Sequence, residues 1–93
     1  MAELGAEELD AINNISPTDA HILSALAEGR NVPVNIADEI ERNPSHVSDR
    51  LAYLREMGLV EIVGSKSVSL HEITERGIEV HEAHEQFQMA LRA

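Results

Sequence analysis

Hydrophobic residues recur at helical spacing over residues 44–57, where the chain has its clearest pattern. Val47, Leu51 and Leu54 stand at i, i+4 and i+7, which gives a helix one apolar face. The opposite face carries small or polar side chains, namely Ser45, His46, Ser48, Asp49 and Ala52. The pattern predicts a helix that is buried along one side and presents a polar surface along the other.

Both ends of this helix carry recognisable signals. Asn43 can accept a hydrogen bond from an amide of the first turn, and Pro44 is well tolerated at the first helical position. Gly58 readily adopts the left-handed conformation that ends many helices. The helix is therefore predicted to have sharp boundaries at both ends.

Two further helices are predicted before it. Ser16, Pro17 and Asp19 form an N-terminal signature, in which the acid reaches back to the cap. The helix they open buries Ile22, Leu23 and Leu26 and ends at Gly29. The next helix spans about residues 33–41, after the poor capping residue Val32, and its inward positions are Ile36, Ala37 and Ile40. Residues 1–15 have a looser apolar pattern, which predicts a short helix or an N-terminal arm.

After Gly58 the hydrophobic period changes from helical to two. Residues 59–63 and 68–73 are predicted strands, joined by a hairpin loop over residues 64–67. In the second strand Val68, Leu70 and Glu72 alternate with the polar Ser67, Ser69 and His71. Thr74 can cap a last helix over about residues 75–91, which has a heptad-like seam of Gly77, Val80, His84, Phe87 and Leu91.

Length and composition exclude several classes of protein. Ninety-three residues make one small domain without room for an enzyme cleft, and no catalytic motif is present, so neither enzymatic activity nor a cofactor is expected. The absence of cysteine excludes disulfides, zinc fingers and thiol catalysis. No apolar run approaches membrane-spanning length and no signal pattern opens the chain, so we expect a cytoplasmic protein with no membrane contact.

The charge balance argues against simple binding to nucleic acid. Seventeen acidic residues face seven Lys and Arg residues, for a net charge of −10, and Lys66 is the single lysine. DNA-binding domains ordinarily carry a basic stripe. Two interpretations remain open. The acids can be an adaptation to molar salt, where the screening length falls to roughly 3 Å, or the domain binds a basic or neutral partner instead of DNA.

The order helix, helix, helix, hairpin, helix is that of a winged helix-turn-helix. This is a mainly α fold with a small β-hairpin (α+β), in which a three-helix core carries a wing and a C-terminal helix. The sequence resembles archaeal winged-helix regulators of the MarR and ArsR kind, and in particular the small repressor-like proteins of haloarchaea and their viruses. The resemblance covers about residues 16–80 and rests on residues 16–19, 36–40, 44–51, 58–61 and 70–77. We divide the chain into an N-terminal arm (1–15), the winged helix-turn-helix domain (16–74) and a C-terminal helix (75–93).

The resemblance implies which residues meet DNA. The helix at about 44–57 would lie in the major groove, and the wing at about 59–73 would reach the adjacent backbone or minor groove. The predicted base contacts are Ser45, His46, Ser48 and Asp49. The predicted phosphate contacts are Arg42, Arg50, Lys66 and the hydroxyl of Tyr53, with Asn43 beside them at the helix start. Relatives often carry a base where Asp49 stands; its carboxylate could accept from a cytosine amino group or pair with Arg42 or Arg50.

The C-terminal seam predicts assembly. Val80, His84, Phe87 and Leu91 would form a homodimer interface, because a single chain would leave them as an exposed apolar stripe. The alternative is that this helix folds back on Leu4, Leu9 and Ile12 of its own chain. His81, His84 and Glu85 have a spacing that can chelate, but the metalloprotease pattern is absent and no metal is expected.

Three functions are compatible with these features. The leading hypothesis is a sequence-specific transcriptional regulator, a repressor, that binds double-stranded DNA as a homodimer. The alternative is a winged-helix module that binds proteins in a transcription or chromosome complex without touching DNA. The third is a ligand or metal sensor, for which the sequence indicates no effector.

Overall fold

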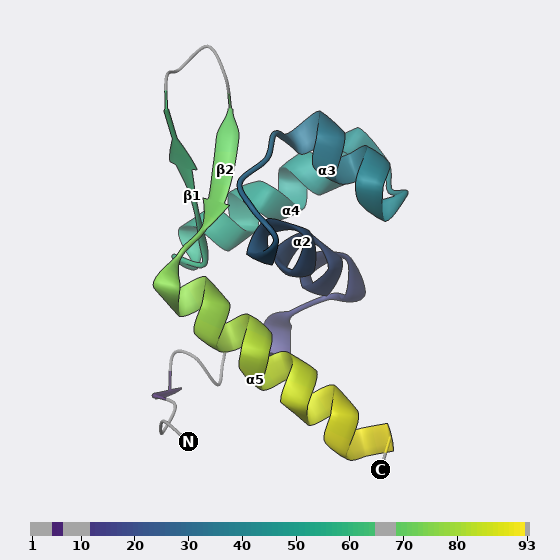
Figure 1. The fold of residues 1–93 in the computed structure, drawn as a ribbon, viewed down its shortest axis with the longest axis vertical. Coiled ribbons are helices and arrows are strands. Elements are labelled where there is room, and N and C mark those ends of the chain that lie inside the picture. The colour runs from purple at the N-terminus through teal and green to yellow at the C-terminus, as the bar shows by residue number, and fades with distance from the viewer. Residues whose placement is uncertain (1–4, 7–11, 65–68, 93) are drawn as a thin grey trace.

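The fold of this chain is seen in a computed structural model, which describes residues 5–6, 12–64 and 69–92 (Figure 1). The elements follow in the order α2 (Pro17–Ala27), α3 (Pro33–Ile40), α4 (Pro44–Glu56), β1 (Val60–Val63), β2 (Leu70–Ile73) and α5 (Glu75–Arg92). The predicted fold class is confirmed: from residue 17 on, the described chain forms three helices, a two-stranded antiparallel hairpin and a long last helix. None of the described helices is both long and apolar enough to cross a membrane.

The start of α2 is fixed by the predicted capping box. The Asp19 amide donates to Ser16 Oγ, and the Ser16 amide donates to Asp19 Oδ2, each over 3.1 Å. The start of α3 is weaker, as expected, because Val32 supplies no side-chain cap. Glu41 ends α3 in the left-handed conformation, with φ of 56°, which turns the chain sharply into α4.

One hydrophobic core joins the three short helices, the hairpin and the start of α5. The predicted inward faces of α2, α3 and α4 all contribute to it. Leu59 and Val60 at the start of the hairpin and Val80 of α5 complete it. Ile12 and Ile15 pack against this core, and residues 12–14 form a helical turn, whereas Leu4 and Leu9 lie outside the described residues. The core therefore holds α4 by its apolar side and leaves its polar side outside.

The hairpin projects from the helical body, away from the far end of α5 (Figure 1). Val60 pairs with Ile73 and Val63 with Leu70 in antiparallel register, and Asn31 adds a single bridge to His71 on the other side of β2. The alternation in the sequence placed His71 on the polar side of this strand, and that prediction is wrong. His71 is buried and Leu70 is only half-buried, because both ring nitrogens of the histidine have partners inside.

The start of α5 is held tightly against the turn that follows α4. Thr74 donates from its hydroxyl to the Gly58 carbonyl over 2.7 Å and accepts from the Gly77 amide over 3.0 Å. The Thr74 amide donates to the Leu59 carbonyl over 3.0 Å. A Cβ atom on Gly77 would lie 2.1 Å from that same carbonyl oxygen, so only glycine fits at this close approach.

We predict that Gly77→Ala destabilises the protein despite the better helix propensity of alanine. The propensity gain is about 1 kcal/mol, whereas overpacking against a fixed backbone carbonyl costs about 1–3 kcal/mol and forces α5 to shift. Urea denaturation measures the difference, with the exposed Glu79→Ala on the same helix as control. A Gly77→Ala protein as stable as the control would contradict the close packing of α5.

Candidate nucleic-acid interface

The recognition surface of this fold would be the outer face of α4, and its residues are placed as predicted. Val47, Leu51 and Leu54 are fully buried in the core. The four residues predicted to touch bases are all exposed: Ser45, His46, Ser48 and Asp49. Asn43 caps the helix, since its Oδ1 accepts from the amides of Ser45 at 2.8 Å and His46 at 3.4 Å. That oxygen is thereby committed to holding the helix start rather than to a partner.

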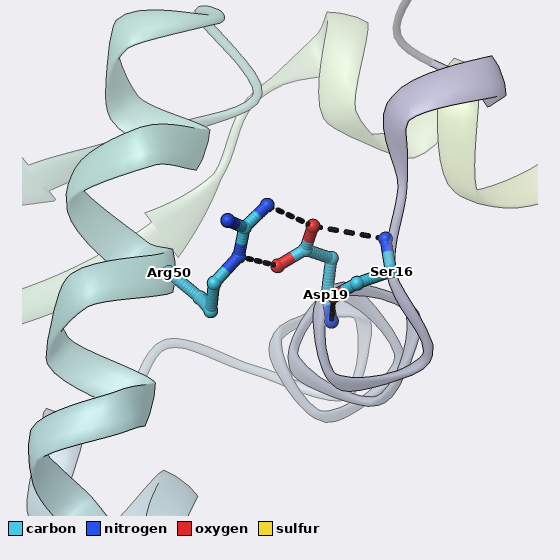
Figure 2. Close-up of polar contacts among 3 residues, drawn as sticks. All are labelled: Ser16, Asp19 and Arg50. Carbon is cyan, nitrogen blue, oxygen red and sulfur yellow. Dashed lines mark hydrogen bonds and ion pairs between the residues drawn. The ribbon is translucent and has the colours of Figure 1, made fainter.

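Arg50 occupies a different place from the one predicted. Its Nε donates to Asp19 Oδ1 over 2.7 Å and its Nη2 to Asp19 Oδ2 over 2.6 Å, a bidentate pair between α4 and α2 (Figure 2). Asp19 is completely buried, and the Arg50 side chain keeps 27% of its surface exposed. The prediction of Arg50 as a phosphate contact is therefore corrected: a buried carboxylate requires a cation, and Arg50 supplies it.

Asp19 has two structural roles, one in the cap of α2 and one in the ion pair with α4. The oxygen that accepts from the Ser16 amide is also the one that meets Arg50 Nη2, so the cap of α2 and the ion pair share one carboxylate. The hydrogen bond to Asp19 raises the pKa of Arg50, against the opposing effect of burial. Sequence reasoning found the cap, because it is local, and missed the ion pair, because 31 residues separate its partners.

Tyr53 belongs to the same cluster. Its ring lies 4.3 Å from the guanidinium carbon of Arg50, within the range of a cation–π contact. The ring is half-buried. Tyr53 therefore covers Arg50 and helps to keep its guanidinium group against α2.

Two other arginines lie at the surface near α4 and the wing. Arg42 is exposed, and its Nη1 makes long hydrogen bonds of 3.4 Å to the carbonyl oxygens of Ile40 and Glu41. Arg30, which sequence reasoning did not select, pairs with Glu72 over 3.5 Å at the base of the wing. Arg30 directly precedes Asn31, whose backbone pairs with His71 of β2. The sequence does not show this pairing, so it could not show that Arg30 lies near the wing. Lys66, predicted at the wing tip, lies outside the described residues.

The far half of α5 carries the predicted apolar surface, with one correction. Val80 is fully buried in the core of its own chain, because the start of α5 packs beneath the hairpin, and so it is not available to a second chain. Phe87 and Leu91 are 55% and 66% exposed, and Met89 beside them is 67% exposed. His84 is half-buried at the edge of this surface.

A groove of about 660 Å³ separates α2 from this half of α5. Three histidines line it, His21 from α2 and His81 and His84 from α5. His81 Nε2 lies 3.6 Å from a carboxylate oxygen of Glu85, and the two form an ion pair only when the imidazole is protonated. The Glu85 side chain is exposed, whereas that of His81 is half-buried. In the described part of the chain, no three His, Asp or Glu side chains converge as metal ligands.

The sequence of this region matches a known family. Residues 16–61 match the family described as bacterial regulatory protein, arsR family. The matched residues span α2, α3 and α4 and end within β1, the first strand of the wing. No curated protein sequence matches the chain.

Solved structures share the fold. Lactococcus lactis ZitR, a zinc-responsive MarR family member, is 26% identical, with a TM-score of 0.66 over 85% of this chain and 59% of that one. Sco5413, a MarR family transcriptional regulator from Streptomyces coelicolor, is 23% identical, with a TM-score of 0.79 over 91% and 61%. The hsRosR-S4 complex is 19% identical, with a TM-score of 0.81 over 89% and 78%.

These relatives are mostly longer proteins. The present chain spans between 54% and 65% of these ZitR chains. The matched family is one of bacterial regulatory proteins.

We predict that substitution of Arg50 and substitution of Arg42 have different effects on the stability of the protein. Arg50→Ala leaves a fully buried carboxylate without its cation, so the free energy of unfolding should fall by about 3–5 kcal/mol. Arg50→Lys, which keeps the charge but loses the bidentate geometry, should lie between wild type and Arg50→Ala. Arg42→Ala should stay within about 0.5 kcal/mol of wild type. Chemical denaturation measures all three, and equal stability of the two alanine variants would refute the structural role of Arg50.

Proposed function

We propose that this chain is a sequence-specific DNA-binding transcriptional regulator, a repressor, which reads the major groove with α4 and reaches the neighbouring backbone with its wing. The ArsR-family helix-turn-helix domain and the fold shared with MarR regulators support a DNA-binding regulator. The observation that carries the proposal is the two-sided character of α4: three buried apolar residues hold it, and four exposed polar residues line its outer face.

The contacts divide by chemistry. Ser45, His46 and Ser48 can exchange hydrogen bonds with base edges, and the carboxylate of Asp49 can accept from the amino group of cytosine. Arg42 at the start of α4 and Lys66 in the loop between the strands would contact phosphate. Arg50 is left out of this set because Asp19 engages it. Tyr53 is left out with it, since its ring covers that arginine.

We further propose that the protein works in a cell of high internal salt, of the kind found in haloarchaea. A net charge of −10 repels a duplex at long range in dilute buffer. At about molar salt the screening length is roughly 3 Å, so only the charges at the contact itself matter. The face of α4 carries Arg42 and Asp49, and thus little net charge where contact would occur.

The active form would be a homodimer joined through the exposed half of α5. Phe87, Met89 and Leu91 place large apolar side chains in solvent on one helix, a surface that a monomer usually avoids. Two-fold packing of this surface would present two α4 helices to successive turns of one DNA face. His84 at its edge would lie near its counterpart in the second chain.

The second candidate is a module that binds protein rather than DNA. The acidic composition favours it, as does the exposed carboxylate of Asp49 on the outer face of α4. Such a module would bind a basic partner, and its affinity would fall as salt screens the attraction. DNA reading through hydrogen bonds would instead persist in molar salt with preference for sequence.

We predict that His46→Ala and Ser48→Ala each lower affinity for a specific site and leave stability unchanged. Loss of one base contact costs about 1–3 kcal/mol of binding free energy. Mobility shifts with genomic fragments, run across a potassium chloride series, first select the site and then compare the variants on it. Ser24→Ala, at an exposed position of α2, is the matched control. Wild-type affinity for the site in both variants would exclude α4 as the reading helix.

We also predict that Phe87→Glu converts a dimer into a monomer. The new carboxylate would be buried without a partner in the two-fold interface, whereas it is solvated in a single chain. Light scattering at micromolar concentration and neutral pH measures the mass. Gln86→Glu, which adds the same carboxylate at the neighbouring exposed position without removing an apolar side chain, serves as control. A wild-type mass equal to one chain would eliminate the dimer and the two-fold DNA site with it.

A further inference from the structure

A buried histidine connects the wing to the helix proposed to read DNA. His71 lies on β2 and is only 2% exposed. Its Nδ1 is 2.8 Å from the Ser69 carbonyl oxygen, and its Nε2 is 2.7 Å from Nη1 of Arg55. Arg55 belongs to the last turn of α4, and Ser69 directly precedes β2 on the side of the hairpin loop. The three groups therefore form a continuous chain from α4 to the wing.

The partners determine the protonation state of the ring. A carbonyl oxygen can only accept, so Nδ1 must carry a hydrogen and donate it. A guanidinium group can only donate, so Nε2 must be without a hydrogen and accept. Only the neutral imidazole with its hydrogen on Nδ1 satisfies both contacts. An imidazolium ion would place a second N–H against Arg55 and bring two cations together.

The same residue joins three backbone segments. Its amide donates to the Asn31 carbonyl over 2.7 Å and its carbonyl accepts from the Asn31 amide over 3.0 Å. On the other side of the strand it stands opposite Ile62 of β1. The connection between α2 and α3, the hairpin and α4 thus meet at one side chain and its backbone. A change at this ring would act on the wing as a whole.

We propose that Arg55 and His71 are a positioning pair that sets the wing against α4, and that protonation of His71 releases it. The proposal rests on the function proposed above, since the wing matters for binding only if the protein binds DNA. In acid the ring can no longer accept from Arg55, and the two charges repel. The hairpin would then lose its connection to the end of α4, and the two DNA-contacting elements would no longer be held in one orientation.

The electrostatic surroundings favour the neutral ring. Burial lowers the pKa of His71, the hydrogen bond to the Ser69 carbonyl raises it, and the charge of Arg55 lowers it again, for a net pKa below the ordinary value. Because the folded pKa lies below the unfolded one of about 6.5, the pair stabilises the fold fully above that pH. The stabilisation declines as the pH falls below about 6.5.

Other charged groups nearby do not reverse this direction. Arg30, in the connection between α2 and α3, and Glu72, next to His71 on β2, pair with each other over 3.5 Å. Ile62, the residue opposite on β1, is apolar. Among the described charged side chains, Arg55 is the one whose charge contributes to the lowered pKa of His71.

The first test needs no DNA. Long-range proton–nitrogen NMR spectra of the intact chain should show the His71 ring with its hydrogen on Nδ1, titrating below about pH 6.5. The backbone amides of Ser69 and Asn31 should shift with the same midpoint. Arg55→Gln, which removes the charge and keeps a donor, should move that midpoint upward. A hydrogen on Nε2, or a ring that titrates at the ordinary value, would overturn the proposal.

The second test separates positioning from folding. In His71→Gln the amide oxygen can replace Nε2 as acceptor for Arg55, and the side chain does not titrate. Between a pH above and a pH below the midpoint found in the ring titration, wild-type affinity for the selected DNA should fall about two- to tenfold more than that of His71→Gln, the value of one hydrogen bond. His46 and His84 are present in both proteins, so any effect of theirs cancels in the comparison.

The outcomes of the two tests are distinct. Equal pH dependence of DNA affinity in wild type and His71→Gln would overturn the positioning role even if both proteins are folded. If His71→Gln does not fold, Arg55→Gln takes its place, and its affinity should fall at a higher pH than that of wild type. Binding of no DNA at any pH would refute the proposed function, and the ring titration alone would then decide whether the positioning pair exists.

Discussion

The arrangement of this molecule depends on a buried carboxylate that serves two helices. Asp19 closes the capping box of α2 and, with the same side chain, accepts hydrogen bonds from Nε and Nη2 of Arg50 on α4. An unpaired charge in that position would be strongly destabilising, so the pair restricts how α4 can rotate against α2. Rotation of α4 about its axis is what decides which residues it presents outward. The polar face of α4 is therefore a consequence of an interaction on its inner side.

A second set of polar contacts extends this constraint from α4 to the wing and α5. Thr74 and Gly77 tie the start of α5 to the turn after α4 through the Gly58 and Leu59 carbonyls. Arg55 and His71 tie the end of α4 to the second strand of the hairpin. Every element of the proposed DNA-binding and assembly surfaces is thus fixed to α4 by directional bonds, not by apolar packing alone. These bonds hold the surfaces proposed to contact DNA in a fixed arrangement, although the domain has few Lys and Arg residues.

The fold could be predicted because its signals are local. The caps at Ser16 and Asn43, the glycine after α4 and the period change into the hairpin each lie within a few residues of what they determine.

Roles that depend on distant partners could not be predicted. The sequence alone suggests that Arg50 is an exposed cation on a polar helix face. It does not show that Asp19, 31 residues earlier, binds this arginine. His71 looked like the polar side of an alternating strand, because the sequence does not show that Arg55 and Ser69 satisfy its ring. Val80 continued a helical seam in the sequence, but the core already buries it.

The central claim is that the outer face of α4 binds DNA at high salt, and amide chemical-shift mapping tests it most directly. Nitrogen-labelled protein would be titrated with a specific DNA fragment in about molar potassium chloride, where long-range repulsion is screened. We expect the largest shifts at residues 42 and 45–49 and along the hairpin, with little change in the exposed half of α5. Shifts confined to α5 or to the groove between α2 and α5, or no shifts at any DNA concentration, would contradict the account.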